Sequence, residues 1–269
     1  MIDPLLPPEG EVVSEHAATW AGRIAALLFL CGGGAFLCFL GAQPDMEEAR
    51  TLLFAIGAAL LALGALAVVQ QSKSRAVLRA DGLERHGLRG KLWALRFADA
   101  PTLLYSVVKV RVGGLIGLLL PAVSTQIHVT LVDAAGKKRK LPINLKGLDV
   151  LAERVVDQHT GLHFPAARKA LDAGEEVRFG KALTVDREKV STRKLFGGQK
   201  SCPLAELEKF AVDGGVLKIR QRGKTFAFAS IQTSAIPNVF ILLRLLESLA
   251  GQSPSALQGR DFSSDRHVG

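Results

Sequence analysis

The sequence contains few of the residues that build disulfide or zinc frameworks, with three cysteines among 269 residues. Cys31 and Cys38 lie in one apolar run, and Cys202 is far from both. None of these spacings is typical of a disulfide framework or a zinc ligand set. We interpret the three cysteines as small apolar residues, since free cysteine is commonly buried.

Polar aromatic residues are also scarce, with one tyrosine and two tryptophans. Proteins that bind single-stranded nucleic acid use aromatic side chains as stacking platforms, and those that read duplex DNA need a recognition element. The chain has neither feature in recognisable form. Although its formal net charge is +9, we do not expect nucleic acid as a partner.

Catalytic and metal-binding motifs are missing as well. His159 and His163 are four residues apart, but Gly161 and Pro165 argue against one continuous helix, and no third ligand is near in sequence. Residues 223–225 resemble the end of a phosphate-binding loop, but the position of its first glycine holds a lysine. We find no nucleophile motif or paired carboxylates. The sequence therefore predicts no enzyme, no cofactor and no metal site.

Charge is absent from two long runs, residues 24–42 and 52–69. At 1.5 Å per helical residue, each run can cross a hydrocarbon layer of roughly 30 Å. A short acidic link joins the runs, so we predict a two-helix transmembrane hairpin over residues 19–70. The absence of an ionisable residue in the middle of either run argues against an ion or proton pathway.

Small residues in these runs are candidates for close helix packing, because they let two backbones approach. The same residues could instead form a homo-oligomer, and the sequence leaves this choice open. The candidates are Gly32, Gly33, Gly34, Ala55, Ala58 and Ala62.

The charge is unevenly distributed along the chain. Residues 1–71 have a net charge of −5 and the remainder a net charge of +14. Basic residues gather after the second apolar run, and such residues mark the cytoplasmic side of a membrane protein. Two spans would return the chain to its starting side. We therefore expect both termini and the soluble domains in the cytoplasm, with anionic lipid headgroups as the nearest acidic surface.

The basic part of the chain contains one pattern twice, in which strands are followed by an amphipathic helix. Alternating strands with a turn between them are predicted over residues 127–143 and again over residues 216–229. Helical stripes follow at residues 148–159 and 239–249. The predicted domains are a disordered acidic tail (1–18), the hairpin (19–70), a first unit (75–163), a helical linker (164–176), a second unit (177–250) and a disordered tail (251–269).

Three segments carry a resemblance to a known family. They are Gly174-Glu-Glu-Val-Arg-Phe-Gly180, Cys202-Pro-Leu-Ala-Glu-Leu-Glu208 and Ile236-Pro-Asn-Val239. With the repeated strand–helix pattern, they resemble a family of uncharacterised bacterial membrane proteins with pleckstrin-homology-like (PH-like) cytoplasmic regions. The resemblance implies a membrane-anchored α+β protein. Its two-helix hairpin would precede two PH-like β-barrel or sandwich units, each closed by a C-terminal helix. It implies placement in the bacterial cytoplasmic (inner) membrane and no activity.

Two basic segments are candidates for contact with anionic lipid or a protein partner. Each basic residue near an anionic leaflet contributes roughly 1 kcal/mol of attraction. The alternative is that they form a solvated turn and a polar sheet face. The residues are Lys137, Lys138, Arg139 and Lys140 in the first segment, and Lys218, Arg220, Arg222 and Lys224 in the second.

The uncharged run at residues 112–123 is too short to cross a bilayer. It is either a buried core segment or an apolar loop that dips into the membrane or binds a partner. Three glycines and a proline suit a strand poorly and favour a loop. The apolar side chains that such a loop would present are Leu115, Ile116, Leu118, Leu119 and Leu120.

Two functions follow from these patterns. The first is a non-enzymatic, membrane-anchored interaction module that binds anionic lipid or an unidentified protein through its PH-like pair. The second is a structural subunit that assembles through its transmembrane helices into a larger membrane complex. Fold alone does not decide between them.

Overall fold

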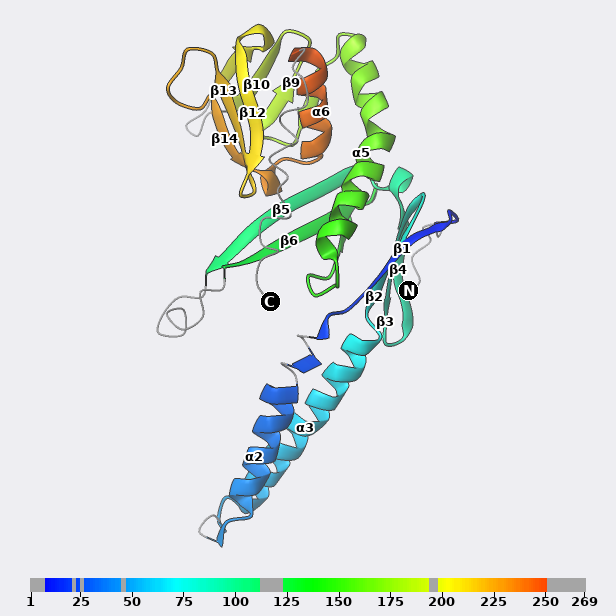
Figure 1. The fold of residues 1–269 in the computed structure, drawn as a ribbon, viewed down its shortest axis with the longest axis vertical. Helices are drawn as coiled ribbons and strands as arrows, with labels where there is room; N and C mark the ends of the chain where they lie inside the picture. The colour runs from blue at the N-terminus through cyan, green and yellow to red at the C-terminus, as the bar shows by residue number, and fades with distance from the viewer. Residues whose placement is uncertain are drawn as a thin grey trace, which may run out of the picture. The chain divides into compact units, whose positions relative to one another are not determined.

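The computed structural model describes residues 8–20, 23–24, 27–44, 47–111, 123–193 and 198–250. The chain is α+β, with several antiparallel sheets (Figure 1). It divides into two compact units. The first unit comprises Met1–Leu95 with Asn144–Leu148, and the second comprises Arg96–Ile143 with Asp149–Gly269.

The first unit contains a four-stranded sheet in the order β1-β2-β3-β4. Strand β2 pairs antiparallel with both β1 and β3. Ala76, Leu78 and Leu83 are fully buried and form part of the apolar core of this sheet. The strands are β1 (Val12–Ala17), β2 (Arg75–Arg79), β3 (Gly82–Gly87) and β4 (Gly90–Arg96).

Strand β1 corrects the prediction that residues 1–18 form a disordered tail, since residues 12–17 are paired with β2. Side-chain contacts around β1 accompany this pairing. Arg75 Nη1 lies 2.8 Å from the Glu15 carboxylate, and the Asp81 carboxylate accepts hydrogen bonds from the backbone N–H groups of Glu9 and Gly10. The Glu15 side chain and these two backbone N–H groups thus meet partners that lie sixty or more residues further along the chain.

Two apolar helices are inserted between β1 and β2. Helix α2 (Gly32–Gly41) follows a π-helical turn, η1 (Leu27–Cys31), and α3 (Arg50–Ser72) runs back to the sheet. The backbone N–H of Ala18 donates to the carbonyl of Ser74 at 3.0 Å, so both ends of the insertion are held together.

The predicted two-helix transmembrane hairpin is wrong. Among the described residues, α3 is the one helix that is long and apolar enough to cross a membrane. The first apolar run gives only the shorter helical stretch Leu27–Gly41. At 1.5 Å per residue this stretch is about 22 Å long, short of the roughly 30 Å of hydrocarbon. The apolar composition was misleading because hydropathy does not fix the length of a helix: Leu27–Cys31 form a π-helical turn, and only Gly32–Gly41 form α2.

Helices α2 and α3 pack through glycine and cysteine. A Cβ added to Gly57 would lie 2.5 Å from Cys38 Sγ and 2.8 Å from the carbonyl oxygen of Gly34. A Cβ added to Gly64 would lie 2.5 Å from Cys31 Sγ. Backbones therefore touch at these positions, as in other small-residue helix contacts.

Of the residues predicted to pack these helices, Gly34 lies at the contact. An added Cβ at Gly33 would meet no atom within 4 Å, and at Gly32 it would approach only the chain's own Leu27 carbonyl, at 3.9 Å. Ala55, Ala58 and Ala62 are exposed on α3.

The second unit begins with a three-stranded sheet in the order β5-β6-β7 and a long helix, α5. Helix α5 is continuous over Leu148–Asp172 although it contains Pro165. The prediction that Gly161 and Pro165 interrupt the helix is therefore wrong. Proline lacks an N–H donor, and its ring crowds the backbone carbonyl four positions before it, here that of Gly161. Helix α5 accommodates this one missing hydrogen bond without ending. The strands are β5 (Thr102–Arg111), β6 (Val123–Val132) and β7 (Lys138–Lys140), after the turn η3 (Phe97–Asp99).

The rest of the second unit contains two more antiparallel sheets and α6 (Val239–Ala250). Helix α6 packs against β12 and η4 (Figure 1). Its leucines Leu242, Leu245 and Leu246 are fully buried. One sheet has β8 (Val177–Phe179), β9 (Leu183–Val185), β10 (Lys189–Arg193) and β11 (Gln199–Pro203). The other has β12 (Leu207–Asp213), β13 (Val216–Gln221) and β14 (Ala229–Gln232), with η4 (Leu204–Glu206) before it and η5 (Thr233–Ala235) after it.

The order of elements is the same in two halves of the chain. Strands β1–β4, a short 3-10 turn, strands β5–β7 and α5 are followed by strands β8–β11, a short 3-10 turn, strands β12–β14 and α6. The first connection differs between the halves. It is residues 18–74 between β1 and β2, and residues 180–182 between β8 and β9.

Candidate anion-binding site

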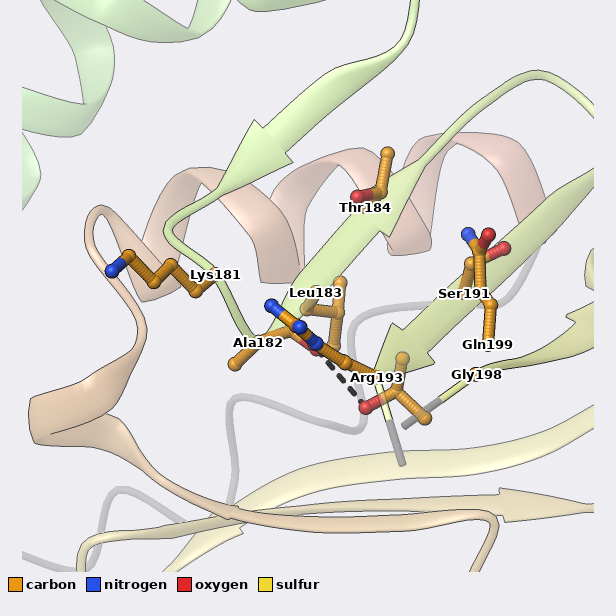
Figure 2. A pocket seen from close by; sticks show the side chains of 9 residues that line it. Lys181, Ala182, Leu183, Thr184, Ser191, Arg193, Gly198 and Gln199 are labelled. Atoms are coloured by element: carbon orange, nitrogen blue, oxygen red, sulfur yellow. Dashed lines mark hydrogen bonds between the residues drawn. The ribbon is translucent and has the colours of Figure 1, made fainter. Parts of the chain in front are cut away.

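A pocket of about 360 Å³ lies on the β8–β11 sheet of the second unit. Its lining comes from the β8–β9 turn, from β9 and β10, and from the start of β11 (Figure 2). None of the lining residues is acidic, and two are cationic. They are Lys181, Ala182, Leu183, Thr184, Ser191, Thr192, Arg193, Gly198 and Gln199.

Strand pairing brings the backbones of the two cationic pocket residues close to each other. The backbone N–H of Arg193 is 3.4 Å from the carbonyl oxygen of Ala182, the residue that follows Lys181. The Thr192 hydroxyl donates to the same carbonyl at 3.0 Å, which fixes the turn against β10. Figure 2 shows Arg193 between Lys181 on one side and Ser191 and Gln199 on the other.

The turn that carries Lys181 requires glycine at its first position. Gly180 has φ +67°, and an added Cβ would lie 2.8 Å from Cδ of Pro237, just before α6. Glycine adopts positive φ without the steric penalty that other residues incur. The residues just before α6 therefore pack against this turn, and Lys181 in the turn is exposed to solvent.

The chemistry of this pocket suits an anion. Arg193 offers a planar set of N–H donors, Lys181 offers an ammonium group, and Gln199 offers an amide. Such donors bind phosphate and carboxylate oxygens with short, charge-assisted hydrogen bonds. The Ser191 hydroxyl is buried and lies 2.9 Å from the hydroxyl of Ser201, so it belongs to the floor of the site.

The second predicted basic segment lies on β13 and the turn after it. Lys218, Arg220, Arg222 and Lys224 are all exposed. Lys218 is hydrogen-bonded to the Asp213 carboxylate at 2.8 Å. Leu217 and Ile219 alternate with Lys218 and Arg220 and are fully buried, so the cations share the outer face of the sheet.

The first predicted basic segment is divided by the structure. Lys137, Lys138 and Lys140 are exposed at the β6–β7 turn and on β7. Arg139 is 8% exposed, with Nη2 3.9 Å from the buried Asp133 carboxylate, and burial lowers the pKa of its guanidinium. Arg139 therefore faces inward and is poorly placed to meet a lipid or partner.

The apolar residues Leu115, Ile116, Leu118, Leu119 and Leu120 lie outside the described residues. The flanking strands β5 and β6 pair in register from Thr102 with Val132 to Arg111 with Val123.

His159 and His163 lie on one face of α5, with ring centroids 4.5 Å apart. Nε2 of His159 is 2.8 Å from the carbonyl oxygen of Ala100, and Nε2 of His163 is 2.9 Å from that of Phe97. These carbonyls accept from the imidazole N–H groups, so the histidines anchor α5 to the η3 turn. The part of the chain that the structure describes holds no group of three or more His, Cys, Asp or Glu residues suited to a metal ion.

Fold and pocket define an α+β protein of antiparallel sheets with one apolar helix long enough to cross a membrane and a cationic surface pocket. The chain belongs to a family of unknown function, DUF6585, whose profile matches residues 10–255. No curated protein and no solved structure matches it.

The sequence did not indicate Lys181 or Arg193 as site residues. The two are twelve positions apart, Lys181 has no basic neighbour, and Arg193 has only Lys194 beside it. Only the pairing of β9 with β10, with Leu183 opposite Thr192, brings them to one place. A useful signal was Gly180 beside Lys181, because glycine before a short turn often marks positive φ.

Proposed function

We propose that this protein is a non-enzymatic interaction module, attached to a membrane, that binds an anionic group in the β8–β11 pocket. The observation that carries the proposal is that Lys181 and Arg193 both line the pocket, and that no carboxylate is among the described residues that line it. An anion there would complete the hydrogen-bonding capacity of the guanidinium and the ammonium groups. Phosphate-bearing lipid headgroups and anionic protein side chains share this chemistry.

Membrane attachment is supported by the surface of the inserted helices. Only 11% of the most apolar window of α3 is buried, which is unlike the core helix of a soluble protein. Leu52, Leu63 and Leu66 are more than half exposed on α3, and Phe36 and Phe39 are similarly exposed on α2. A continuous apolar surface of this kind suits lipid hydrocarbon.

The side of attachment follows from the residues after α3. Lys73, Arg75 and Arg79 come directly after the helix and favour the cytoplasmic side. Helix α3 ends at Ser72, and only Lys73 and Ser74 separate it from β2, so the first sheet lies on the side of the membrane where α3 ends. We place this side, and the second unit that follows it in the chain, in the cytoplasm.

The experiment is a calorimetric titration of the full chain in neutral detergent with inorganic phosphate and with glycerol 3-phosphate. We expect saturable binding of at least one of these probes, and at least tenfold weaker binding after Lys181→Ala with Arg193→Ala, because charge-assisted hydrogen bonds are lost. Equal binding by wild type and variant, or no binding by wild type, would overturn the proposed pocket.

A charge-matched control is available on the same sheet. Arg178 on β8 and Lys189 on β10 are exposed, and neither lines the pocket. Each lies near an acidic side chain, Glu176 at 4.0 Å and Asp186 at 3.9 Å. The Arg178→Ala with Lys189→Ala variant removes the same number of positive charges and should bind the probes like the wild type.

A further inference from the structure

The turn from β13 to β14 holds an aromatic side chain in solvent, and exposed cations precede it in the same turn. Phe226 is 85% exposed, more than any other large apolar side chain among the described residues. Arg222 and Lys224 are exposed in the same turn. A phenylalanine so placed leaves nearly all of its apolar surface in water, which is unfavourable unless a partner covers it.

The turn is held in place by backbone contacts. The N–H of Arg222 donates to the carbonyl of Glu206 at 2.7 Å, and the N–H of Phe228 donates to the carbonyl of Ile219 at 2.8 Å. Phe228 is buried, and the Lys200 ammonium lies 4.8 Å from the centre of its ring. The fold thus turns Phe228 inward and presents Phe226 outward.

The sheet next to this turn carries positive charge on its outer face. Lys209 on β12 is directly opposite Arg220 on β13 in the strand register, and both are exposed. Like charges directly opposite each other destabilise a sheet. Neither residue forms an ion pair within the described ranges, whereas Lys218, two positions before Arg220, is paired with Asp213. The face therefore keeps an unneutralised pair of cations.

We infer that the β13–β14 turn and the outer face of β12 and β13 dock onto an anionic lipid bilayer. Phe226 enters the interfacial region, while Lys209, Arg220, Arg222 and Lys224 meet the headgroups. A bilayer surface offers negative charge and an apolar layer side by side, which matches both features of this surface. The inference rests on the proposed membrane attachment, because α3 brings the chain to a bilayer, and is independent of the pocket.

The test is hydrogen–deuterium exchange of the full chain mixed with lipid nanodiscs. One disc preparation is phosphatidylcholine alone, and the other contains phosphatidylglycerol as well. We expect exchange in residues 222–228 to slow roughly tenfold in the anionic discs and not in the neutral discs, with the protection lost in 0.5 M salt. Equal exchange in the two kinds of disc would overturn the bilayer as the occupant.

Two variants separate this surface from other sources of protection. Phe226→Ser removes an exposed side chain from a turn, so the chain should fold, and the protection should fall roughly tenfold. The matched control is Leu162→Ser, which removes another exposed apolar residue, 51% exposed on α5, and should leave the protection unchanged.

The double variant Lys181→Ala with Arg193→Ala tests the pocket alone. If protection persists in it while phosphate binding is lost, the two sites are independent, and loss of protection in it would contradict the inference.

Discussion

The first connection of the β1–β4 sheet and the first connection of the β8–β11 sheet occupy equivalent places in the chain order but have opposite character. Between β1 and β2 stand two apolar helices, without a charged residue from Thr51 to Ser72. Between β8 and β9 stand three residues, Gly180–Ala182, with a lysine that lines a cationic pocket. One connection suits hydrocarbon, and the other suits an anion.

This difference shows which part of the repeated pattern is free to change. A hairpin connection can be lengthened at modest entropic cost, provided that the strands on either side still pair. The β1–β2 pairing from Val12 with Arg79 to Ala17 with Arg75 forms despite the insertion, with one irregularity between Val12 and Ser14. We conclude that the strands maintain the fold, and that these connections can differ without disturbing it.

The two units should respond differently to acid, and His159 gives the largest effect. Burial lowers the pKa of its imidazole to about 4. The charge of His163 lowers this pKa further, whereas the hydrogen bond to Ala100 raises it. Because the unfolded state binds the proton more tightly, stability is complete above pH 6.5 and falls as the pH drops toward 4. The loss should reach about 3 kcal/mol.

This prediction can be checked by chemical unfolding of the full chain between pH 7 and pH 4. His159→Gln, which keeps a donor for the Ala100 carbonyl but cannot titrate, should flatten the pH dependence of the second unit. An unchanged pH profile in that variant would show that His159 is not the group responsible.

The next effect concerns the apolar connection. Gly57→Leu forces a side chain into the space of Cys38 Sγ and the Gly34 carbonyl, so it should destabilise the helix pair by about 2–3 kcal/mol. Unfolding in neutral detergent measures this loss. Ala58→Leu adds the same side chain at the neighbouring, exposed position, and a loss as large there would contradict the packing described.

The short connection should be sensitive to one methyl group. Gly180→Ala places a Cβ at a position with positive φ and against Pro237, so it should lower the stability of the second unit by about 2 kcal/mol. Gly174→Ala places a Cβ at a position with φ +83° but in open space, so it should lower the stability by about 1 kcal/mol. Thermal unfolding of both variants measures the two losses of stability, and their difference is the effect of the contact with Pro237. Equal losses would contradict a role for that contact.

The smallest effect concerns Glu84 in the first unit, which is 3% exposed. Burial would raise the pKa of this carboxyl, but hydrogen bonds from Lys91 and His86 and the charges of Lys91 and Arg79 outweigh it and lower the pKa below 4.5. Its contribution is therefore complete above pH 4.5 and is lost as the pH falls through the lowered value. Since Lys91 and Arg79 are partly exposed, Glu84→Gln should cost only about 1 kcal/mol at pH 7. A pH profile unchanged in this variant would contradict the assignment.

Local sequence patterns identified some elements and failed for others. The alternation at residues 127–132 and 216–220 lies within β6 and β13, and the stripe at 239–249 lies within α6. Strand β1 was missed because its pairing with β2 depends on residues about sixty positions away. Similarly, the inward position of Arg139 depends on Asp133, which the run of basic residues did not reveal.

The pocket was hidden for the same reason, since strand pairing, and no local motif, unites Lys181 with Arg193. The first apolar run, residues 24–42, shows the opposite limitation. Its composition was clear, but hydrophobicity does not determine how many of its residues join one α-helix, and Leu27–Cys31 form a π-helical turn before α2.

The most direct test of the central claim, that the inserted helices attach the chain to a membrane, is flotation of the full chain with neutral phosphatidylcholine vesicles in high salt. Wild-type protein should float with the vesicles, and a variant with Leu63→Arg and Leu66→Arg on the exposed face of α3 should float much less, since charge is costly in hydrocarbon. Wild-type protein that stays at the bottom of the gradient would contradict the account.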